Sequence, residues 1–412
     1  MPRKSTTPAK RGVKPPTKAR PNVRTGPAKP PRSARRPARG GTKRDEEGTG
    51  RGAAKPAVPA KRPATPARKA PAKKAERTIG TPPDVELQLQ AIEQDGGDGE
   101  VELGRGRRLH VSSLDRVVFP DVGVTKGAVM RYYARMSRFM LPDLEGRPLI
   151  LKRYPTGVGG EMFFQQDAGP HVPDVVTVHQ VNTVDKGKQD RIIGGDLATL
   201  LYTVQLGAIE VHPWFSRVQD PDAPDRSLID LDPGEGVPFA WVVELAQEIV
   251  RIARECSLPV VLKTSGSRGI HLVFPLPARS TFETSARLSE LVAQAATVAR
   301  PDLATVERSI RSRPERSIYV DAMQNAHGKS MAAAYSLRAR PTATASAPLR
   351  PRELTPRLKL TGFTVTTMPA RSERIGDIWR EGVSERPTAR GLARAMQVLE
   401  DAIATPPRAG RR

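Results

Sequence analysis

Residues 228–236 read LIDLDPGEG, and this stretch decides the fold because an apolar strand ends there in two carboxylates and a turn. Asp230 and Asp232 lie two positions apart, and alternate side chains of a strand point to the same face of a sheet. Two carboxylates held so close repel each other unless a cation lies between them. Oxygen ligands at this spacing suit Mg²⁺ or Mn²⁺. A strand end with two solvated acids before a Pro-Gly turn is the alternative interpretation.

A glycine-rich motif, SGSRGIH, occupies residues 265–271 and begins 33 residues after Asp232. Its glycines let the backbone approach a ligand closely. Together with backbone amides, the hydroxyls of Ser265 and Ser267 and the guanidinium of Arg268 favour a phosphate-binding turn. His271 begins the next predicted strand, where it can donate to a phosphate or sugar oxygen. The alternative is a glycine-rich hairpin with a structural histidine; the stretch is not a Walker A loop, because GxxxxGK[ST] is absent.

A third motif, SIYVDAMQNAHGKSMAAAYSLRARP, spans residues 317–341. Asp321 ends an apolar strand, as Asp232 does, and is placed to supply a third carboxylate. Gln324 follows it closely, and Arg338 and Arg340 alternate onto one face of a further predicted strand. Paired arginines beside carboxylates suit a triphosphate, whereas a solvated strand face with surface ion pairs explains the same pattern without a ligand.

Two upstream stretches add basic and aromatic residues. LKRYPTG contains Lys152, and VHPWFSR contains His212 and Trp214, with Phe163 and Phe164 between the two stretches. Burial is the default explanation for Phe163 and Trp214. Exposed aromatic rings beside basic groups also stack on nucleic-acid bases, and spacing alone does not decide between the two interpretations.

Apolar periodicity and turn signals predict strands and helices in mixed order. Thr125 is expected to cap a helix that runs to Met140. The core positions of this helix are expected to be Val129, Met130, Tyr133, Met136 and Met140. Other helices are predicted at residues 196–208, 237–256, 281–299 and 389–403. Strands are predicted at residues 110–111, 148–154, 209–214, 227–232, 259–264, 270–275 and 317–321. The absence of a regular βαβ repeat indicates an α+β, or mixed α/β, fold.

Charge divides the 412-residue chain into segments. The net charge is +23, of which residues 1–80 hold +20, together with 14 of the 40 prolines and no aromatic residue. We expect this segment to be a disordered tail, either with weak affinity for DNA phosphates or a solvated linker without a partner. Residues 81–106 are expected to be an acidic, glycine-containing linker with a short helix near residues 85–92. A folded domain is expected at residues 107–405, followed by a basic tail at 406–412.

Composition excludes several classes of protein. The single cysteine, Cys256, cannot form an internal disulfide or a CxxC-type zinc or iron–sulfur site. It suits a reducing cytoplasm. No run of about 18 apolar residues is present, so no membrane association is expected. The N-terminus lacks the apolar region of a secretory signal.

Read together, the motifs resemble the polymerase domain of bacterial ligase D, a member of the archaeo-eukaryotic primase superfamily. The resemblance covers residues 109–404 and rests on DLDPGEG, KTSGSRGIH and YVDAMQN in that order. LKRYPTG, EVHPWFSR, YSLRARP and MPARSERIGD support it. The resemblance implies a primase-type catalytic core and a primase-polymerase that extends DNA ends during non-homologous end joining, with NTPs or dNTPs as substrates and a preference for ribonucleotides and Mn²⁺.

The resemblance also implies roles for particular residues. The metal-binding, catalytic carboxylates are expected to be Asp230, Asp232 and Asp321. The nucleotide contacts expected from the resemblance or from the motifs themselves are Lys152, His212, Ser265, Arg268, His271, Gln324, Arg338 and Arg340. Arg116 and Lys126 match a pocket for the 5′-phosphate at a break, and Phe164 matches an aromatic residue that stacks on a template base. The family commonly has Lys where Arg116 and Arg268 stand, and Arg presents a planar fork in place of a point charge.

Three functions remain open from the sequence. The first is two-metal nucleotidyl transfer to DNA at breaks or gaps; the others are a non-catalytic DNA-end or chromatin-binding protein and a primase that starts chains de novo. The sequence contains no KxDG motif, so we expect no ligase activity and a separate ligase as partner. Partnership with the end-binding protein Ku follows from the resemblance alone. We expect a cytoplasmic, nucleoid-associated bacterial protein.

Overall fold

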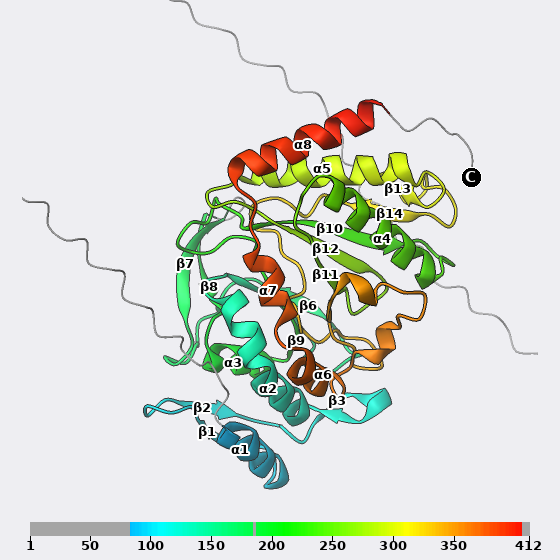
Figure 1. The fold of residues 1–412 in the computed structure, drawn as a ribbon. Helices are drawn as coiled ribbons and strands as arrows, with labels where there is room; N and C mark the ends of the chain where they lie inside the picture. The colour runs from blue at the N-terminus through cyan, green and yellow to red at the C-terminus, as the bar shows by residue number, and fades with distance from the viewer. Residues whose placement is uncertain (1–82, 184–186, 406–412) are drawn as a thin grey trace, which may run out of the picture. The chain divides into compact units, whose positions relative to one another are not determined.

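Strand β10 (Arg226–Pro233) is an inner strand of the largest sheet in the computed structural model of this chain, which describes residues 83–183 and 187–405. The tails predicted at residues 1–80 and 406–412 lie outside the described residues. Within them the fold is mixed α/β, as predicted (Figure 1). None of the described helices has the length and apolar content that crossing a membrane requires.

The largest sheet has six strands, and all of its neighbouring pairs are antiparallel except β13 and β14. Its strands in spatial order are β13 (Ala304–Thr305), β14 (Ile318–Asp321), β10, β12 (Ile270–Pro275), β11 (Val261–Thr264) and β15 (Pro348–Leu349). The strands predicted at residues 227–232, 259–264, 270–275 and 317–321 therefore all join this sheet.

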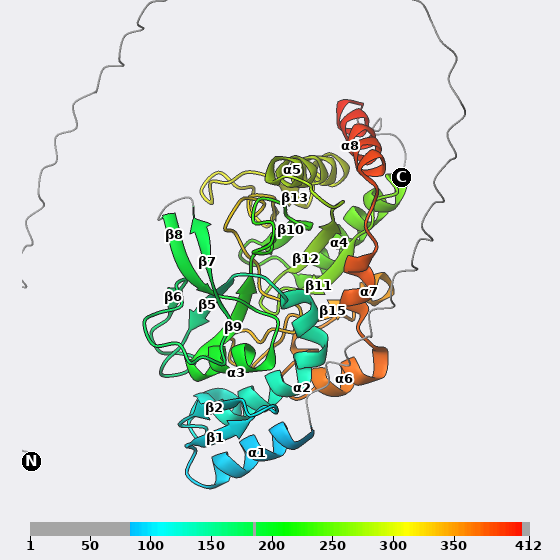
Figure 2. The ribbon, with the colours of Figure 1, turned by 90° about the vertical axis from the view of Figure 1, so that its left-hand side faces the viewer.

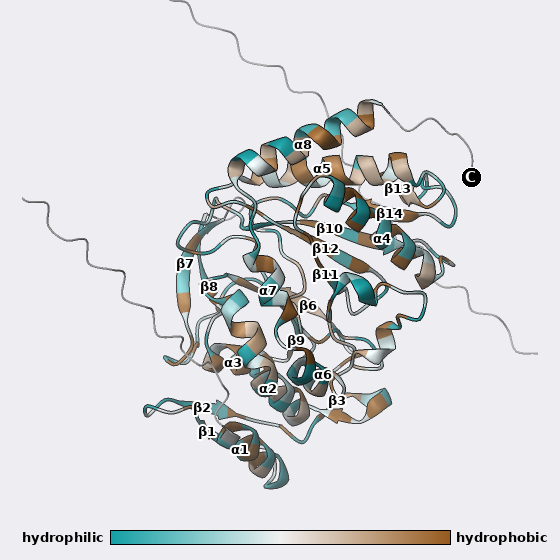
Figure 3. Cartoon of the chain, in the orientation of Figure 1, coloured by the Kyte–Doolittle hydropathy of each residue, from teal (hydrophilic) through white to brown (hydrophobic). Residues whose placement is uncertain are grey.

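One face of the six-stranded sheet is covered by helices. Ile229 and Leu231 alternate with the carboxylates of β10 and are 0 % exposed, while the hydroxyl of Ser227 donates to the carbonyl of Ser285 at 2.8 Å. The covering helices are α4 (Phe239–Glu255), α5 (Phe282–Ala299) and α8 (Ala389–Ala404), with α8 lying on α5. Figure 3 shows apolar residues along the strands of the sheet and along α5. Alternation therefore leaves the opposite face of β10 free to carry the polar residues.

A second group of strands lies beside this sheet (Figure 2). It consists of the three-stranded sheet β6 (Phe163–Gln165), β5 (Leu149–Arg153) and β9 (Ala208–Pro213), and the hairpin β7 (Val178–Thr183) and β8 (Gly187–Ile192). Helices α2 (Lys126–Leu144) and α3 (Leu197–Gln205) pack here. Thr125 caps α2 as predicted, accepting from the amide of Ala128 at 3.0 Å, and the five predicted core positions of this helix are buried.

Residues 83–106 are folded, so the linker predicted at residues 81–106 is wrong there, whereas the short helix expected near residues 85–92 is present. Helix α1 (Pro83–Gln94) packs on α2, and β1 (Gly99–Glu102) pairs with β2 (Arg108–Val111). The helix buries Val85 and Leu89 completely. These two residues are four positions apart, so even this mostly polar sequence has an apolar stripe along one helix face.

The remaining elements are short. They are β3 (Val117–Phe119), η1 (Pro120–Val122), β4 (Val124–Thr125), η2 (Pro351–Glu353), η3 (Leu360–Gly362), α6 (Met368–Ile375) and α7 (Ile378–Ser384). Sequence periodicity did not predict α6 or α7, which have only eight and seven residues. Trp379 of α7 is nevertheless completely buried.

Candidate active site

Strand register aligns four polar residues in one row across the six-stranded sheet. Asp230 of β10 lies directly opposite Asp321 of β14 on one side and His271 of β12 on the other, and Lys263 of β11 lies opposite His271. Directly opposed residues of antiparallel strands present their side chains on the same face. The row therefore joins two of the predicted catalytic carboxylates to residues of the glycine-rich motif.

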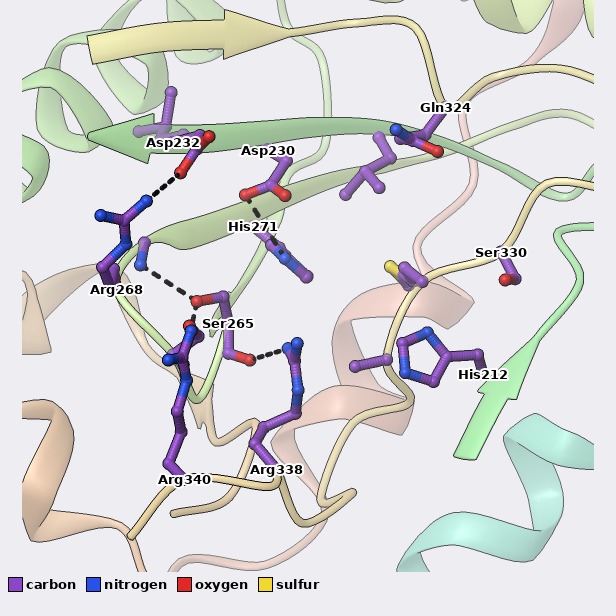
Figure 4. A pocket seen from close by; sticks show the side chains of 16 residues that line it. His212, Asp230, Asp232, Ser265, Arg268, His271, Gln324, Ser330, Arg338 and Arg340 are labelled. Atoms are coloured by element: carbon purple, nitrogen blue, oxygen red, sulfur yellow. Dashed lines mark hydrogen bonds and ion pairs between the residues drawn. The ribbon is translucent and has the colours of Figure 1, made fainter. Parts of the chain in front are cut away.

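This face borders a cavity of about 330 Å³ (Figure 4). The predicted site residues that line it are His212, Asp230, Asp232, Ser265, Arg268, His271, Gln324, Arg338 and Arg340. Two of the predicted catalytic or nucleotide-binding residues do not line it. Lys152 of β5 contacts Glu210, and the carboxylate of Asp321 accepts from the amide of Met323 at the start of the next loop.

The two carboxylates of β10 have opposite pKa shifts. Burial disfavours the charged form of Asp230, but His271, with Nε2 at 3.4 Å from Oδ1, and Lys263 outweigh it and lower the pKa. Burial and the neighbouring charge of Asp230 raise the pKa of Asp232, although Arg268 lies 3.4 Å from it. A pair of titratable groups whose pKa values are driven apart is typical of functional sites.

Asp321 has local hydrogen-bond partners. Its carboxylate accepts from the amide of Met323 at 2.8 Å and from the side-chain amide of Gln324 at 3.2 Å. Within residues 83–183 and 187–405, no three His, Cys, Asp or Glu side chains stand close enough together to hold a metal ion. Asp230 and Asp232 thus offer oxygen donors to the cavity, while Asp321 lies at the neighbouring register position.

The glycine-rich turn closes one wall of the cavity. The Ser265 hydroxyl oxygen accepts from the amides of Ser267 at 3.1 Å and Gly269 at 3.0 Å, so it shapes the turn itself. Gly266 has a φ of +68°. A Cβ on Gly269 would lie 2.0 Å from the carbonyl oxygen of Leu231, so only glycine allows the turn to approach β10 this closely.

Glu210 is a functional residue that the sequence did not reveal. It is 2 % exposed, and its carboxylate contacts His212 Nε2 at 3.0 Å, Arg338 Nε at 2.9 Å and Lys152 Nζ at 3.3 Å. These partners outweigh burial and hold its pKa well below the usual range. Three predicted nucleotide-binding residues are thus oriented by one buried carboxylate. Glu210 lies two positions before His212 on an apolar strand, so alternation places both side chains on the same face. This spacing is the sequence signal that could have identified it.

The strand predicted to carry Arg338 and Arg340 is not formed. The chain turns there instead, with the amide of Arg340 donating to the carbonyl of Arg338 at 2.7 Å, and Tyr335 has a φ of +67°. Both arginines nevertheless reach the glycine-rich turn, where Arg338 donates to the carbonyl of Ser265 and Arg340 to the hydroxyl of Ser267. Turn geometry, and not strand alternation, brings them to one side.

Two histidines face the cavity from different sheets. Burial lowers the pKa of His212, although Glu210 opposes the shift. Burial and the adjacent Lys263 lower the pKa of His271 to about 4. His271 is therefore neutral at pH 7. Lys263, which the sequence did not reveal either, is itself completely buried.

Arg116 and Lys126 lie together, lining a small cavity of about 10 Å³ away from the main one. Lys126 is 3 % exposed, and its ammonium donates to the carbonyl of Ser112 and to the side chain of Gln205, each at 2.8 Å. Burial and the charge of Arg116 lower its pKa to about 8. The structure thus brings the two predicted cations to one place.

The undecided aromatic residues differ in exposure. Phe163 is 45 % and Phe164 56 % exposed, whereas Trp214 is 2 % exposed and packs edge-on against His327. Phe164 and Trp214 line a second cavity of about 350 Å³ that shares Gln324 and Ser330 with the first. Phe164 is therefore the ring that a ligand can reach, and Trp214 belongs to the core.

Comparison with known proteins yields one family. The family model described as LigD, primase-polymerase domain, matches residues 125–379. The LigD end-joining proteins of Bacillus subtilis and Pseudomonas aeruginosa are 32 % and 30 % identical to the chain over 65 % and 68 % of its length. The polymerase domain of Mycobacterium tuberculosis ligase D, solved in complex with DNA, matches with a TM-score of 0.63 and 31 % identity, covering 68 % of this chain and 99 % of that one.

The extent of these matches differs. The chain spans only 43 % and 33 % of the length of the two curated relatives, whereas it covers nearly all of the solved polymerase domain. The matched residues include β10, the glycine-rich turn and all three cavity arginines. On this evidence the chain belongs to the LigD primase-polymerase family.

Proposed function

We propose that this chain is a DNA-repair nucleotidyltransferase that adds nucleotides to the 3′-hydroxyl of DNA at breaks and gaps in non-homologous end joining. The observation that carries the proposal is the row across the sheet, which places Asp230 opposite Asp321 on the face that borders the glycine-rich turn. Membership of the family supports the same reaction class, and the matched mycobacterial polymerase domain was solved with DNA.

The cavity suits a nucleoside triphosphate. Its volume of about 330 Å³ is in the usual range for small ligands, and Arg268, Arg338 and Arg340 line it together with His212. Glu210 and the Ser265 carbonyl hold the guanidinium of Arg338 in place before any ligand arrives. A preorganised cation stabilises developing phosphate charge without reorganising. His271 and Gln324 complete the proposed nucleotide contacts at the cavity. Lys152, paired with Glu210 beside Arg338, is the further cation that we assign to the nucleotide.

The donor set fits divalent metal ions that prefer oxygen ligands. Asp230 and Asp232 face the cavity with carboxylates, and Asp321 is the third donor that the register offers. Mg²⁺ or Mn²⁺ suits such donors. Two such ions, when bound, would lower the pKa of the primer 3′-hydroxyl and neutralise charge on the triphosphate.

The chain's own residues position the reaction. The primer 3′-oxygen forms the new bond to the α-phosphorus, the bond to the β-phosphate oxygen breaks, and pyrophosphate leaves. The three cavity arginines hold the phosphates and balance their charge, so most of the catalysis is positioning and electrostatic stabilisation. We assign no side chain as general base.

The finer parts of the proposal concern DNA and partners. We assign Phe164 to stacking on a template base, and Arg116 with Lys126 to the 5′-phosphate at a gap. Ribonucleotides are the proposed preferred substrate. Ku and a DNA ligase are the proposed partners. The bacterial nucleoid, where DNA ends occur, is the proposed location.

The test is NTP addition to a primer on gapped DNA in the presence of Mn²⁺. The double variant Asp230→Ala, Asp232→Ala should lose incorporation by about 10³-fold or more, because charge stabilisation of this kind contributes several kcal/mol. Asp401→Ala, which changes an exposed aspartate of α8, should match the wild type. Undiminished incorporation by the double variant would contradict the proposal.

The same assay separates the two other functions. Synthesis on a single-stranded template without a primer would indicate a de novo primase. A wild-type chain that binds gapped DNA but incorporates nothing with either metal would indicate a binding protein.

A further inference from the structure

Residues 335–338 carry Arg338 to the nucleotide cavity without forming a regular strand. On one edge of this segment the main chain supplies the partners, because the amide of Arg338 donates to the carbonyl of Thr344 at 2.7 Å. The other edge faces β9, whose ladder in the described part of the chain is formed with β5 alone. Buried main-chain groups need hydrogen-bond partners, so side chains have to supply them between β9 and this segment.

Tyr133 of α2 supplies two of these partners. Its phenol donates to the carbonyl of Ile209 at 2.7 Å, and its oxygen accepts from the amide of Leu337 at 3.0 Å. The side chain of Tyr133 is 0 % exposed. Phenylalanine would fill the same apolar space, so the hydroxyl contributes these two hydrogen bonds and the ring contributes the packing.

Ser336 adds a second connection to β9. Its hydroxyl oxygen accepts from the amide of Val211 at 3.0 Å and lies 3.2 Å from the Tyr133 oxygen. Ser336 is also 0 % exposed. The two buried hydroxyls therefore join β9 to residues 336–337 from inside the core, in place of a strand ladder.

The residues next to these contacts are the ones that meet at the cavity. Glu210 follows Ile209, Arg338 follows Leu337, and the carboxylate of Glu210 accepts from Arg338 Nε at 2.9 Å. Fixing Ile209 against Leu337 therefore fixes the main-chain positions from which both side chains start. Arg338 Nη1 donates to the carbonyl of Ser265. Its Nη2 has no partner among the described residues and is left for a phosphate oxygen.

We propose that Tyr133 is a positioning residue, which through Ile209 and Leu337 holds the guanidinium of Arg338 at the site of the triphosphate. This inference rests on the proposed nucleotide binding at Arg338. Tyr133 does not line the cavity, so it acts on the nucleotide only through the main chain of its two partners.

The first measurement is the Kd of the full chain for ATP with Mg²⁺, by calorimetry and without DNA. A hydrogen bond to a charged group is worth about 10- to 100-fold in affinity, and a displaced guanidinium loses part of it. We therefore expect Tyr133→Phe to weaken binding by about 3- to 10-fold. The matched control is Tyr202→Phe, another buried tyrosine, whose hydroxyl donates to the carbonyl of His171 at 3.3 Å. It should stay within about twofold of the wild type.

The second measurement repeats Tyr133→Phe in an Arg338→Met background. If Tyr133 acts through Arg338, the substitution should then change the Kd by less than about twofold, because the effects of coupled residues do not add. A general defect of the core would weaken binding equally in both backgrounds. That result would overturn the proposal, as would a single Tyr133→Phe variant with the Kd of the wild type.

Amide hydrogen exchange tests the same contact without a nucleotide. The amide of Leu337 should exchange about tenfold faster or more in Tyr133→Phe, because it loses its acceptor, and at the wild-type rate in Tyr202→Phe. An unchanged rate in Tyr133→Phe would overturn the inference. If Tyr133→Phe does not fold, Ser336→Ala takes its place in the binding cycle.

The outcomes separate the inference from the proposed function. A wild type that binds ATP but transfers no nucleotide to DNA would contradict the proposed function and leave the binding cycle to decide the role of Tyr133. A wild type that binds no ATP would also contradict the proposed function, and the exchange rate of the Leu337 amide would then decide.

Discussion

Each end of strand β10 holds a cluster that contains both aspartate and arginine, and the two clusters differ in how completely their charges are paired. At its start, Asp143, Arg147, Asp225 and Arg226 form a closed cluster, in which Arg226 contacts Asp143 at 2.6 Å and Asp225 at 2.8 Å. At its end, Asp230, Asp232, Arg268 and His271 form an open cluster. Its Asp232–Arg268 pair is 3.4 Å apart and about half exposed.

The difference in pairing distinguishes the closed cluster, which stabilises the fold, from the open cluster, which belongs to the candidate site. In the closed cluster, the indole of Trp379 also donates to Asp143 at 3.0 Å, so α2, β10 and α7 are joined by satisfied charges. The arginines outweigh burial and lower the pKa of Asp143 to about 2. In the open cluster the pKa of Asp232 moves upward. Charges satisfied within the protein stabilise the fold, whereas charges left partly unpaired are available to a ligand.

The largest expected effect is on the stability of the closed cluster. Asp225→Ala leaves Arg147 and Arg226, which are 0 % and 3 % exposed, without one of their carboxylates. Removing one partner of a buried ion pair costs about 3–5 kcal/mol. The free energy of unfolding in urea measures this loss. Asp232→Ala should change it by less than about 0.5 kcal/mol, and equal losses in the two variants would remove the distinction between the clusters.

The next effect is an acid dependence of opposite sign at Asp143 of the closed cluster and Asp232 of the open cluster. Asp143 has a lowered pKa, so its contribution of roughly 2 kcal/mol is present above its ordinary pKa of 3.8 and is lost as the pH falls toward about 2. Asp232 has a raised pKa, so its protonation on acidification favours the folded state. Thermal unfolding from pH 5 to pH 2 tests this. Asp143→Asn should flatten the acid limb, and an unchanged slope would contradict the assignment.

Close approach of the glycine-rich turn to the open cluster gives a third prediction. Gly269→Ala would place a Cβ 2.0 Å from the Leu231 carbonyl between the two aspartates, so β10 and the turn must separate. We expect a loss of about 1–3 kcal/mol in stability, with lower NTP incorporation. Gly362→Ala, where no atom lies within 4 Å, is the matched control. Equal stability and activity in the two variants would show that the approach is not required.

The smallest effect concerns Lys126, a buried cation with neutral partners. Its pKa of about 8 means that the free protein loses this charge as the pH rises through 8. Preference for a 5′-phosphate over a 5′-hydroxyl on gapped DNA should then fall by up to about tenfold per pH unit above 8. Binding titrations between pH 7 and pH 9 measure it. A preference that is constant up to pH 9 would exclude Lys126 as the phosphate ligand.

Local signals predicted the elements that carry the site. The strand Ile270–Pro275 was predicted to the residue, and the helix expected at residues 281–299 begins one residue later, at Phe282. Both elements depend on apolar periodicity within a short stretch. Helix α1 was predicted near residues 85–92 but was assigned to a linker, because its few apolar residues gain burial only against α2. The hairpin β7–β8 was missed for a related reason, since its strands are mostly exposed and polar.

Residues that act through other residues could not be predicted in this way. Strand pairing places Glu210 opposite Lys152 and Lys263 opposite His271. Neither strand pairing can be predicted from a local sequence motif. Arg338 and Arg340 were predicted as site residues because of their charge, and both line the cavity. The strand predicted to carry them is a turn.

The pairing of β10 with β14 has a consequence for the order in which the protein folds during synthesis. Asp230 and His271 are close in the chain, whereas Asp321 is made ~90 residues after Asp230, roughly 5–20 s later at ribosomal rates. The strands that carry the glycine-rich turn can therefore pair before β14 exists. Chains released before β14 is made would hold the turn without the third carboxylate.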